Sequence, residues 1–463
     1  MNDMLLDAIR SGNLQLQLPQ TLRLNGGESL HCEQLLRLLP GKRGVFKARY
    51  RDQLVLAKVF LASAARQVER EHAGYERLTI AQQPTPKLIA SVSFDGGTAL
   101  IFEFLIDAQP LFREDVVPSA RELKCLLDRL QSMYSAGVYH DDLHWGNFLL
   151  QGDIAFVIDA GAVLGDPPRP LTPAQASENL GLLIAQFRRC DQEIVRNAVL
   201  AHALCGQFEL TSSAVTMIAE KHWQRRKQAL LQKCFRDTTA NRFVRAFDRV
   251  YAYQRAYAGT GLDAFLRDPD GAMARGTALK LGNSATVVKL DLDGRAVVIK
   301  RYNIKNALHW LRRCWRPSRA WASWRNAHWL ELLGLLTPKP IAFLEMRWGF
   351  LRRRAYYVCE FIEGDSLADE LERREPSSAE IRELEKYFAT AASDRLIHGD
   401  MKATNFFLHN ERLAILDLDA MREESAARWK RLFWRDFTRF SRNWPNNANW
   451  LDQLRNFVTR LLT

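Results

Sequence analysis

The pattern of apolar and polar positions predicts a strand-rich segment early in the chain. Residues 39–58 read as a strand, a tight glycine turn, a returning strand and a third strand that ends in Lys58. Further elements are expected downstream: a helix at 64–80, strands at 88–93 and 98–104, an amphipathic helix at 119–135 and helical segments at 172–232. Strands followed by helices predict an α+β fold.

The hydrophobic pattern of the second half begins in a similar way. Residues 281–301 are predicted to form a strand, a turn at Asp293-Gly294 and a second strand with Lys300 near its end. Far downstream, aromatic side chains recur at every third or fourth position from Trp429 to Trp444. This spacing favours a buried helix face over a surface that contacts a membrane.

Four polar residues occur twice in one spacing, which is an internal repeat. His140, Asp142, Asn147 and Asp159 have counterparts 258 residues later, and these counterparts are His398, Asp400, Asn405 and Asp417. The repeat predicts two copies of one domain, and 463 residues suffice for two cores. We place the boundary near residue 233, which gives domains at 1–232 and 233–463.

The repeated residues have the spacing of a kinase catalytic loop, H-x-D-x-x-x-x-N, followed by a metal-binding Asp. Such a loop needs one carboxylate to meet the acceptor hydroxyl. It also needs amide and carboxylate oxygens to bind the Mg²⁺ that bridges the phosphates of ATP. The expected catalytic residues are Asp400 and Asp142, and the expected metal ligands are Asn405, Asp417, Asn147 and Asp159.

Glycines and a lysine in each strand-rich segment are candidates for nucleotide binding. Gly41 and Gly44 lie in a flap whose backbone N–H groups can approach phosphates, while Lys58 reaches the phosphate oxygens. An ordinary hairpin with a surface lysine is the alternative for this segment taken alone. Glu71 is the expected ion-pair partner of Lys58. The corresponding candidates in the second copy are Gly282 and Lys300.

Composition excludes several classes of protein. Seven cysteines without a C-x-x-C pair predict a reduced, cytosolic chain without a zinc site. Neither a signal peptide nor a run of about 18 apolar residues is visible, so we expect neither export nor a membrane span. The net charge of +12 lies entirely after residue 232, where 40 Lys and Arg face 28 Asp and Glu. This asymmetry points to an anionic partner.

Cations and tryptophans are interleaved in residues 295–330, which hold nine Lys or Arg, five Trp and no acid. Indole rings at an apolar boundary beside guanidinium groups suit an anionic lipid layer. The expected lipid contacts are Arg312, Arg313, Arg316 and Arg319. The same composition can bind nucleic acid. No nucleic-acid motif accompanies it, so a membrane or lipopolysaccharide is favoured. Core packing of several tryptophans is the alternative.

These motifs resemble the lipopolysaccharide core kinases, bacterial enzymes that phosphorylate Kdo or heptose of the inner core. The matching segments of the second half are Val297–Arg301, Arg325–His328, Thr337-Pro338, His398–Asn405 and the run that ends in Asp419. The first half matches through Lys58, Arg70-Glu71, Thr85-Pro86, His140–Asn147 and Asp159. The resemblance implies two tandem bilobal protein-kinase-like domains that use ATP and Mg²⁺. It also implies an anionic glycolipid acceptor at the cytoplasmic face of the inner membrane.

The copies depart from the family pattern and from each other. Asn326 stands where the first copy has Glu71, so Lys300 lacks that partner or pairs with Glu331 one turn on. Lys402, expected to touch the transferring phosphate, is matched in the first copy by His144, a weaker fixed charge near neutral pH. Two alternatives stay open, namely a protein or small-molecule kinase and a nucleotide-binding pseudokinase in one or both copies. The oligomeric state is not predicted.

Overall fold

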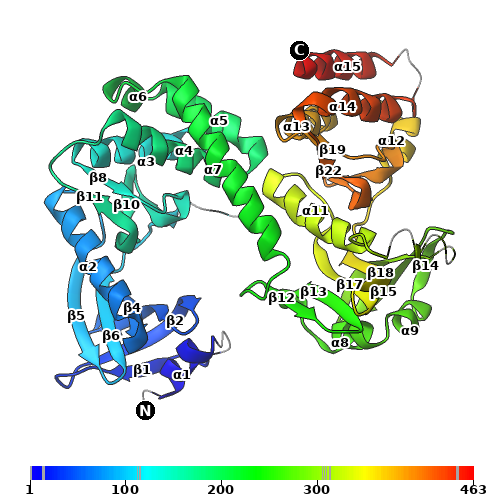
Figure 1. Ribbon diagram of the computed structural model, residues 1–463. Coiled ribbons are helices and arrows are strands. Elements are labelled where there is room, and N and C mark those ends of the chain that lie inside the picture. Colours follow the sequence, from blue (N-terminus) through cyan, green and yellow to red (C-terminus); the bar gives the residue numbers. More distant parts are fainter. Residues whose placement is uncertain are drawn as a thin grey trace. The chain divides into compact units, whose positions relative to one another are not determined.

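A computed structural model of the chain describes residues 3–12, 16–111, 113, 116–304, 306, 308, 310–311, 314–444 and 448–463. The chain divides into two compact units (Figure 1). Unit 1 comprises Met1–Phe187 and Gln192–Trp223, and unit 2 comprises Arg188–Asp191 and Gln224–Thr463. The change of unit falls within helix α7 (Ser212–Lys233). Among the described residues, no helix has the length and apolar character needed to cross a membrane.

Unit 1 opens with a six-stranded antiparallel sheet. Its strands are β1 (Gln20–Arg23), β2 (Ser29–Leu39), β3 (Arg43–Tyr50), β4 (Gln53–Leu61), β5 (Leu88–Phe94) and β6 (Gly97–Glu103), in the order β1-β2-β3-β4-β6-β5. Alternate residues of β4 face opposite sides, because side chains along a strand alternate. Val55, Ala57 and Val59 pack with α1 (Asp3–Ser11). Phe60 packs on the other face with α2 (Ala65–Ile80).

The remainder of unit 1 is mostly helical. Its helices are α3 (Ala120–Ser135), α4 (Pro173–Gln186), α5 (Gln192–Ala201), α6 (Ala203–Gln207) and part of α7. The short strands are β7 (Gln109–Pro110), β8 (Val138–His140), β9 (Phe148–Gln151), β10 (Ile154–Val157) and β11 (Val163–Gly165). A capping box starts α3, since Ser119 and Glu122 each bond the other's backbone N–H. The buried faces of α3 and α4 form the core beneath the catalytic-loop segment.

Unit 2 opens with a seven-stranded antiparallel sheet. Its strands are β12 (Asn241–Arg245), β13 (Arg249–Gln254), β14 (Thr277–Leu281), β15 (Ala285–Leu292), β16 (Arg295–Tyr302), β17 (Pro340–Trp348) and β18 (Leu351–Glu360). The order is β12-β13-β17-β18-β16-β15-β14. Helices α8 (Thr260–Arg267) and α9 (Pro269–Ala274) pack on this sheet, and α11 (Arg319–Leu333) contacts β17 and β18.

The two sheets share the order of five strands. In unit 1 these are β2-β3-β4-β6-β5, and in unit 2 they are β14-β15-β16-β18-β17. In each case the middle strand carries the predicted lysine, Lys58 in β4 and Lys300 in β16. Helix α2 precedes β5 in the chain, and helix α11 likewise precedes β17. The lysine therefore lies at the same place in both sheets.

The second half of unit 2 is helical around a short hairpin. The helices are α12 (Leu367–Arg373), α13 (Ser378–Ser393), α14 (Ala426–Ser441) and α15 (Asn449–Leu462) (Figure 1). Short strands β19 (Leu396–Ile397), β20 (Phe406–His409), β21 (Arg412–Ile415) and β22 (Arg422–Glu423) lie between α13 and α14. Phe433, Phe437 and Phe440 of α14 are buried against Phe388. The predicted buried aromatic face and the predicted α+β class are both confirmed.

Candidate active site

The catalytic-loop segment of unit 2 connects β19 to β20. His398 is buried, and its Nε2 lies 3.1 Å from the carbonyl oxygen of Leu416. The side-chain nitrogen of Asn405 donates to the carbonyl oxygen of Asp400, at 2.8 Å. This bond holds the Asn405 amide in one orientation and leaves its side-chain oxygen available to a ligand.

Asp417 follows β21 and meets the lysine of the sheet. Its φ angle of 57° is a left-handed conformation that is uncommon outside glycine and clusters at functional sites. Lys300 Nζ donates to Asp417 and, at 3.3 Å, to Asp419. Burial opposes the charge on Lys300, but Tyr302, Asp417 and Asp419 outweigh it and raise the pKa of the lysine. Lys300 is therefore a fixed cation.

A cavity of about 260 Å³ separates the sheet from the catalytic-loop segment. Val287, Val298, Tyr357 and Cys359 line one part of it, and the polar residues Lys300, Asn405 and Asp417 line another. Gly282 lies between two lining residues, Lys280 and Ser284, and its backbone bonds Asn303 and Ala285. An apolar slot that also carries charged groups suits a nucleotide, whose base is flat and whose phosphates are anionic.

The oxygen donors of this cavity fit a metal that is bound together with phosphates. Asn405 and Asp417 offer an amide oxygen and a carboxylate, which are hard ligands of the kind Mg²⁺ takes. In the described part of the chain, no group of three His, Cys, Asp or Glu side chains is placed to hold a metal unaided. Mg²⁺ ordinarily keeps water and phosphate ligands beside one or two protein oxygens, so this donor set is sufficient.

Unit 1 places its predicted residues in a related arrangement. Lys58 Nζ lies 2.8 Å from Glu71 Oε1 and 3.9 Å from Asp159. Asn147 donates to the carbonyl oxygen of Asp142 at 3.1 Å, which repeats the bond between Asn405 and Asp400. The expected contact between Lys58 and Glu71 is present in the structure.

Arg43, which was not predicted from the sequence, lies beside the predicted residues of unit 1. Arg43 donates to Glu71 at 3.0 Å and lies 3.7 Å from Asp159. Burial raises the pKa of Glu71, whereas Lys58 and Arg43 outweigh burial at Asp159 and lower its pKa. Two cations therefore face the predicted metal ligand of unit 1.

The predicted glycines of the unit 1 flap differ in their environments. Gly41 lies in the β2–β3 turn with φ of 69°, a conformation that favours glycine. Gly44 lies in β3, where a Cβ atom would fall 2.5 Å from the ring of Phe46 and 3.2 Å from Ile9. Close packing on the face of the sheet that carries α1 thus explains why position 44 is a glycine.

Asn326 of unit 2 has a different partner from Glu71 of unit 1. Its side-chain nitrogen donates to the carbonyl oxygens of Leu418 and Met421, at 2.8 and 2.9 Å. Glu331 lies 3.0 Å from His328 rather than beside Lys300, so Glu331 as a substitute partner of Lys300 was wrong. It faces the neighbouring turn of α11. Asp417 and Asp419 take the place of the helix carboxylate.

Three side chains around Asp400 complete the site, and one of them, Lys402, was predicted from the sequence. Lys402 Nζ lies 3.3 Å from Asp400, and the guanidinium group of Arg439 lies 2.6 Å from its other carboxylate oxygen. Asp436 accepts a hydrogen bond from the backbone N–H of Gly399, at 2.8 Å. Two patterns in the sequence could have indicated the residues that were not predicted. They are the arginines at four-residue spacing in residues 431–439 and the pair Asp417-x-Asp419.

The basic, tryptophan-rich stretch is divided between core and surface. Trp324 and Trp329 are fully buried, and Trp321 stacks on Phe235 at 3.7 Å. The predicted contacts Arg312 and Arg313 lie outside the described residues. Core packing, the alternative interpretation, therefore holds for these three tryptophans.

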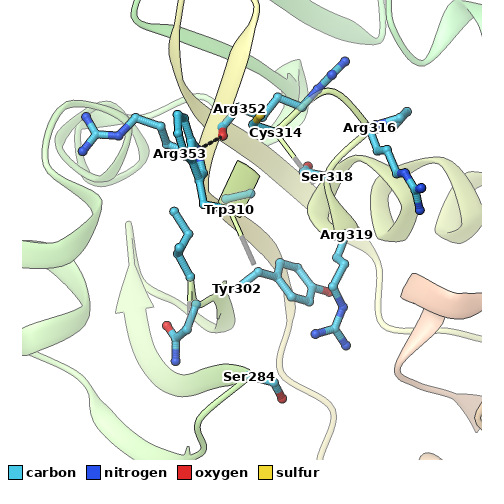
Figure 2. A pocket seen from close by; sticks show the side chains of 13 residues that line it. Ser284, Tyr302, Trp310, Cys314, Arg316, Ser318, Arg319, Arg352 and Arg353 are labelled. Carbon is cyan, nitrogen blue, oxygen red and sulfur yellow. Dashed lines mark hydrogen bonds between the residues drawn. The ribbon is translucent and has the colours of Figure 1, made fainter. Parts of the chain in front are cut away.

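A second cavity, of about 250 Å³, lies where this stretch meets the sheet (Figure 2). The lining residues with guanidinium groups are Arg316, Arg319, Arg352 and Arg353. Trp310 donates from its indole nitrogen to the carbonyl oxygen of Arg352, at 2.8 Å (Figure 2). Arg319 also pairs with Asp419 at 2.8 Å and covers Tyr302, so it lines both this cavity and the cavity of about 260 Å³ beside Lys300.

Comparison with known proteins gives three findings. A solved structure of WaaP in complex with acyl carrier protein is 19% identical, covering 44% of this chain and 97% of its own, with a TM-score of 0.29. The kinase domain of BubR1 is 14% identical, covering 32% of this chain and 51% of its own, with a TM-score of 0.27. No curated protein matches the chain.

The family comparison concerns unit 2. Residues 284–456 match the model of the lipopolysaccharide kinase (Kdo/WaaP) family. This range begins just before β15 and includes Asp400 as well as Lys300, Asn405 and Asp417, which line the cavity of about 260 Å³. This part of unit 2 is therefore similar to the lipopolysaccharide kinase (Kdo/WaaP) family.

Proposed function

We propose that unit 2 is an ATP-dependent kinase that phosphorylates a sugar hydroxyl of the lipopolysaccharide inner core. One observation carries the proposal: Lys300, Asn405 and Asp417, from three separate segments, line one cavity with an apolar slot. A kinase needs this combination, since it must hold a base, neutralise phosphates and position an acceptor. The family match over the same residues supports the acceptor class.

Each residue has a role that follows from its place. Lys300, a half-buried cation with two carboxylate partners, binds phosphate oxygens when nucleotide enters, and Arg319 lies beside it as a second cation. Asn405 and Asp417 hold Mg²⁺, which neutralises charge on the phosphates when it is bound. The hydrogen bond from the Asn405 side chain to the carbonyl oxygen of Asp400 fixes the orientation of that side chain within the catalytic loop.

Asp400 acts on the acceptor. Its carboxylate orients the sugar hydroxyl and accepts the hydroxyl proton as the new bond from oxygen to the γ-phosphorus forms. The bond from the γ-phosphorus to the bridging oxygen breaks, and ADP leaves with the electron pair of that bond. Lys402, 3.3 Å from Asp400, is placed to contact the transferring phosphoryl group.

Unit 1 is proposed as a second kinase-like copy, on the strength of its shared strand order and its Lys58–Glu71 pair. Asp142, Asn147 and Asp159 remain predictions for catalysis and metal binding there. Arg43, beside Asp159, competes with a metal ion for that carboxylate. We therefore assign transfer to the glycolipid acceptor to unit 2.

The acceptor class implies work at a lipid surface, and unit 2 has a suitable patch. Phe247, Trp315, Trp348 and Phe350 have exposed fractions of 70%, 61%, 66% and 68%. They surround the β17–β18 turn: Trp315 stacks on Phe350 at 5.4 Å, and Gly349 donates to the carbonyl oxygen of Phe247 at 2.9 Å. We call these four residues the aromatic patch.

Cations adjoin the aromatic patch. Arg316 follows Trp315, and Arg353 follows the β17–β18 turn. Both are exposed, and neither side chain makes a hydrogen bond or ion pair with any described residue. Exposed indoles beside free guanidinium groups match the interfacial zone of an anionic bilayer. We propose that the aromatic patch holds unit 2 at the cytoplasmic face of the inner membrane.

The acceptor assignment is tested in cells by mass spectrometry of core oligosaccharide. A strain without the protein is expected to lose phosphate from the inner core, and the wild-type gene is expected to restore it. The Asp400→Asn variant, expressed at equal level, is expected to fail. An unchanged phosphate content in the strain that lacks the protein would contradict the proposed acceptor.

A further inference from the structure

A groove beside the catalytic loop is lined by four arginines of one helix. Arg431, Arg435 and Arg439 follow one another at four-residue intervals in α14, and Arg442 comes at the end of that helix. Residues at this spacing lie on one face of a helix. The groove, of about 990 Å³, also includes Gly399 of the catalytic loop.

Three of the four arginines of this groove are not paired with an acid among the described residues. Arg431, Arg435 and Arg442 are exposed, and their side chains make no hydrogen bond or ion pair in the described part of the chain. Asp436 is the acid among the lining residues, and it is buried with an oxygen bound to the N–H of Gly399. The groove therefore presents three unpaired cations to solvent.

The fourth arginine connects the groove to the proposed catalytic carboxylate. Arg439 lies 2.6 Å from Asp400, and its side chain is partly exposed. An ion pair in this position occupies the carboxylate oxygen that an acceptor hydroxyl would use. An anion that enters the groove competes with Asp400 for Arg439.

The corresponding helix of unit 1 lacks these arginines. Asn179 of α4 donates to the carbonyl oxygen of His140, at 2.8 Å, so it ties its helix to the catalytic loop as Asp436 does. Counted from this anchor, the positions of the four arginines are held in α4 by Ala174, Glu178, Leu182 and Ala185. The charge of the groove is therefore a property of unit 2 and not of the shared fold.

We infer that the groove binds an anionic substituent of the acceptor, a phosphate or carboxylate close to the hydroxyl that becomes phosphorylated. The inference rests on the proposed function of unit 2 and adds the feature by which the acceptor is chosen. Arg431, Arg435 and Arg442 bind the anion through charge-assisted hydrogen bonds. Arg439 turns from Asp400 to the same anion and leaves the carboxylate free for the hydroxyl.

The test compares three forms of one core oligosaccharide as acceptors. One form carries a phosphate, one carries a carboxylate and one carries neither. The full chain carries Arg431→Gln, Arg435→Gln and Arg442→Gln together, and kcat/KM is measured for each acceptor. The variant is expected to lower the preference for an anionic over the neutral acceptor by about 10- to 100-fold, as expected when charged hydrogen bonds are lost. Arg428→Gln, in the same helix but outside the groove, is the control for loss of a positive charge from this helix.

The outcomes separate the inference from the proposed function. Loss of preference for the phosphate acceptor or for the carboxylate acceptor supports the inference and identifies the anion. Arg439→Gln is expected to lower kcat/KM with the anionic acceptor and raise it with the neutral one, an inversion that a purely structural role would not give. Unchanged preference in the triple variant would overturn the inference while transfer itself persists. Wild-type protein that phosphorylates none of the three acceptors would overturn the proposed function instead.

Discussion

Asn326 in α11 holds the place that Glu71 holds in α2, yet the two side chains bind different partners. Glu71 pairs with Lys58 of the sheet, at 2.8 Å, whereas Asn326 binds the backbone of Leu418 and Met421. The lysine of unit 2 pairs with Asp417 and Asp419 instead. In unit 2 the helix thus orients the segment that carries Asp417, the proposed metal ligand, and that segment supplies the carboxylates for the lysine.

Replacement of Asn326 by Leu is expected to destabilise unit 2. The amide is fully buried, and its removal leaves the carbonyl of Met421 without another donor among the described residues, whereas the carbonyl of Leu418 keeps the backbone N–H of Met421. An unsatisfied group costs about 1–3 kcal/mol of unfolding free energy. Urea denaturation of the full chain measures the loss, with Asn197→Leu, at an exposed position of α5, as the control. Equal midpoints for the two variants would contradict the proposed role of Asn326.

Asp400→Asn and Asp417→Ala are expected to separate catalysis from nucleotide binding. Asp400→Asn removes the proton acceptor and lowers kcat by about 10²- to 10⁴-fold, the usual contribution of general-base catalysis. It leaves the nucleotide cavity intact. Asp417→Ala removes a metal ligand and a partner of Lys300, so the Mg²⁺-dependent part of nucleotide binding disappears. Thermal shifts with a nonhydrolysable ATP analogue, with and without Mg²⁺, measure binding. Wild-type turnover in both variants would exclude unit 2 as the catalyst.

The aromatic patch and its arginines are expected to contribute separately to membrane binding. Trp348→Ala with Phe350→Ala removes apolar contacts, so partitioning onto vesicles falls at both low and high salt. Arg316→Gln with Arg353→Gln removes about 1 kcal/mol per cation at low salt, and this loss is screened at high salt. Co-sedimentation with anionic vesicles measures both, and Met217→Ala, an exposed apolar side chain of unit 1, is the control.

Neither pair of substitutions is expected to alter turnover on a soluble sugar acceptor. Partitioning that all these variants share with the wild type would contradict the membrane assignment. Strong salt-dependent binding to single-stranded RNA without binding to anionic vesicles would favour a nucleic-acid partner instead.

Acid is expected to destabilise both units through their buried catalytic-loop histidines. Burial lowers the pKa of His140 and of His398, and the Nδ1 atom of each has no hydrogen-bond partner among the described residues. Below the ordinary histidine pKa of about 6.5, the unfolded chain binds protons that the folded chain does not. The unfolding free energy therefore falls as pH falls, by up to about 1.4 kcal/mol per pH unit for each histidine.

Urea midpoints between pH 7.5 and 5.5 measure this dependence. His398→Gln removes one titrating group and is expected to give a shallower dependence on pH than the wild type, whatever its stability at pH 7.5. An equal slope in the two proteins would show that His398 is charged in the folded state.

Much of the arrangement could be predicted from the sequence because spacing along the chain constrains the catalytic loop. Asp400 and Asn405 lie five residues apart, so their hydrogen bond is a local property of the loop. The strand that carries Lys300 could be placed from its alternation and the Asp293-Gly294 turn. The buried face of α14 followed from the three- and four-residue spacing of its aromatic side chains.

Other contacts depended on distances that no local pattern encodes. Arg439 reaches Asp400 because Asp436, in the same helix, ties α14 to the backbone of Gly399. The pairing of Lys300 with Asp419 requires both the sheet and the turn after β21 to be in place. The tryptophans of residues 295–330 could not be divided into core and surface, since cations and indoles alternate on both the buried and exposed parts of the stretch.

The most direct test of the central claim is transfer of labelled γ-phosphate from ATP to purified inner-core oligosaccharide by the full chain. The wild-type protein and Asp142→Asn are expected to label the acceptor at similar rates, whereas Asp400→Asn labels it at less than about a hundredth of that rate. Labelling that survives Asp400→Asn and disappears with Asp142→Asn would place the reaction in unit 1 and contradict the account.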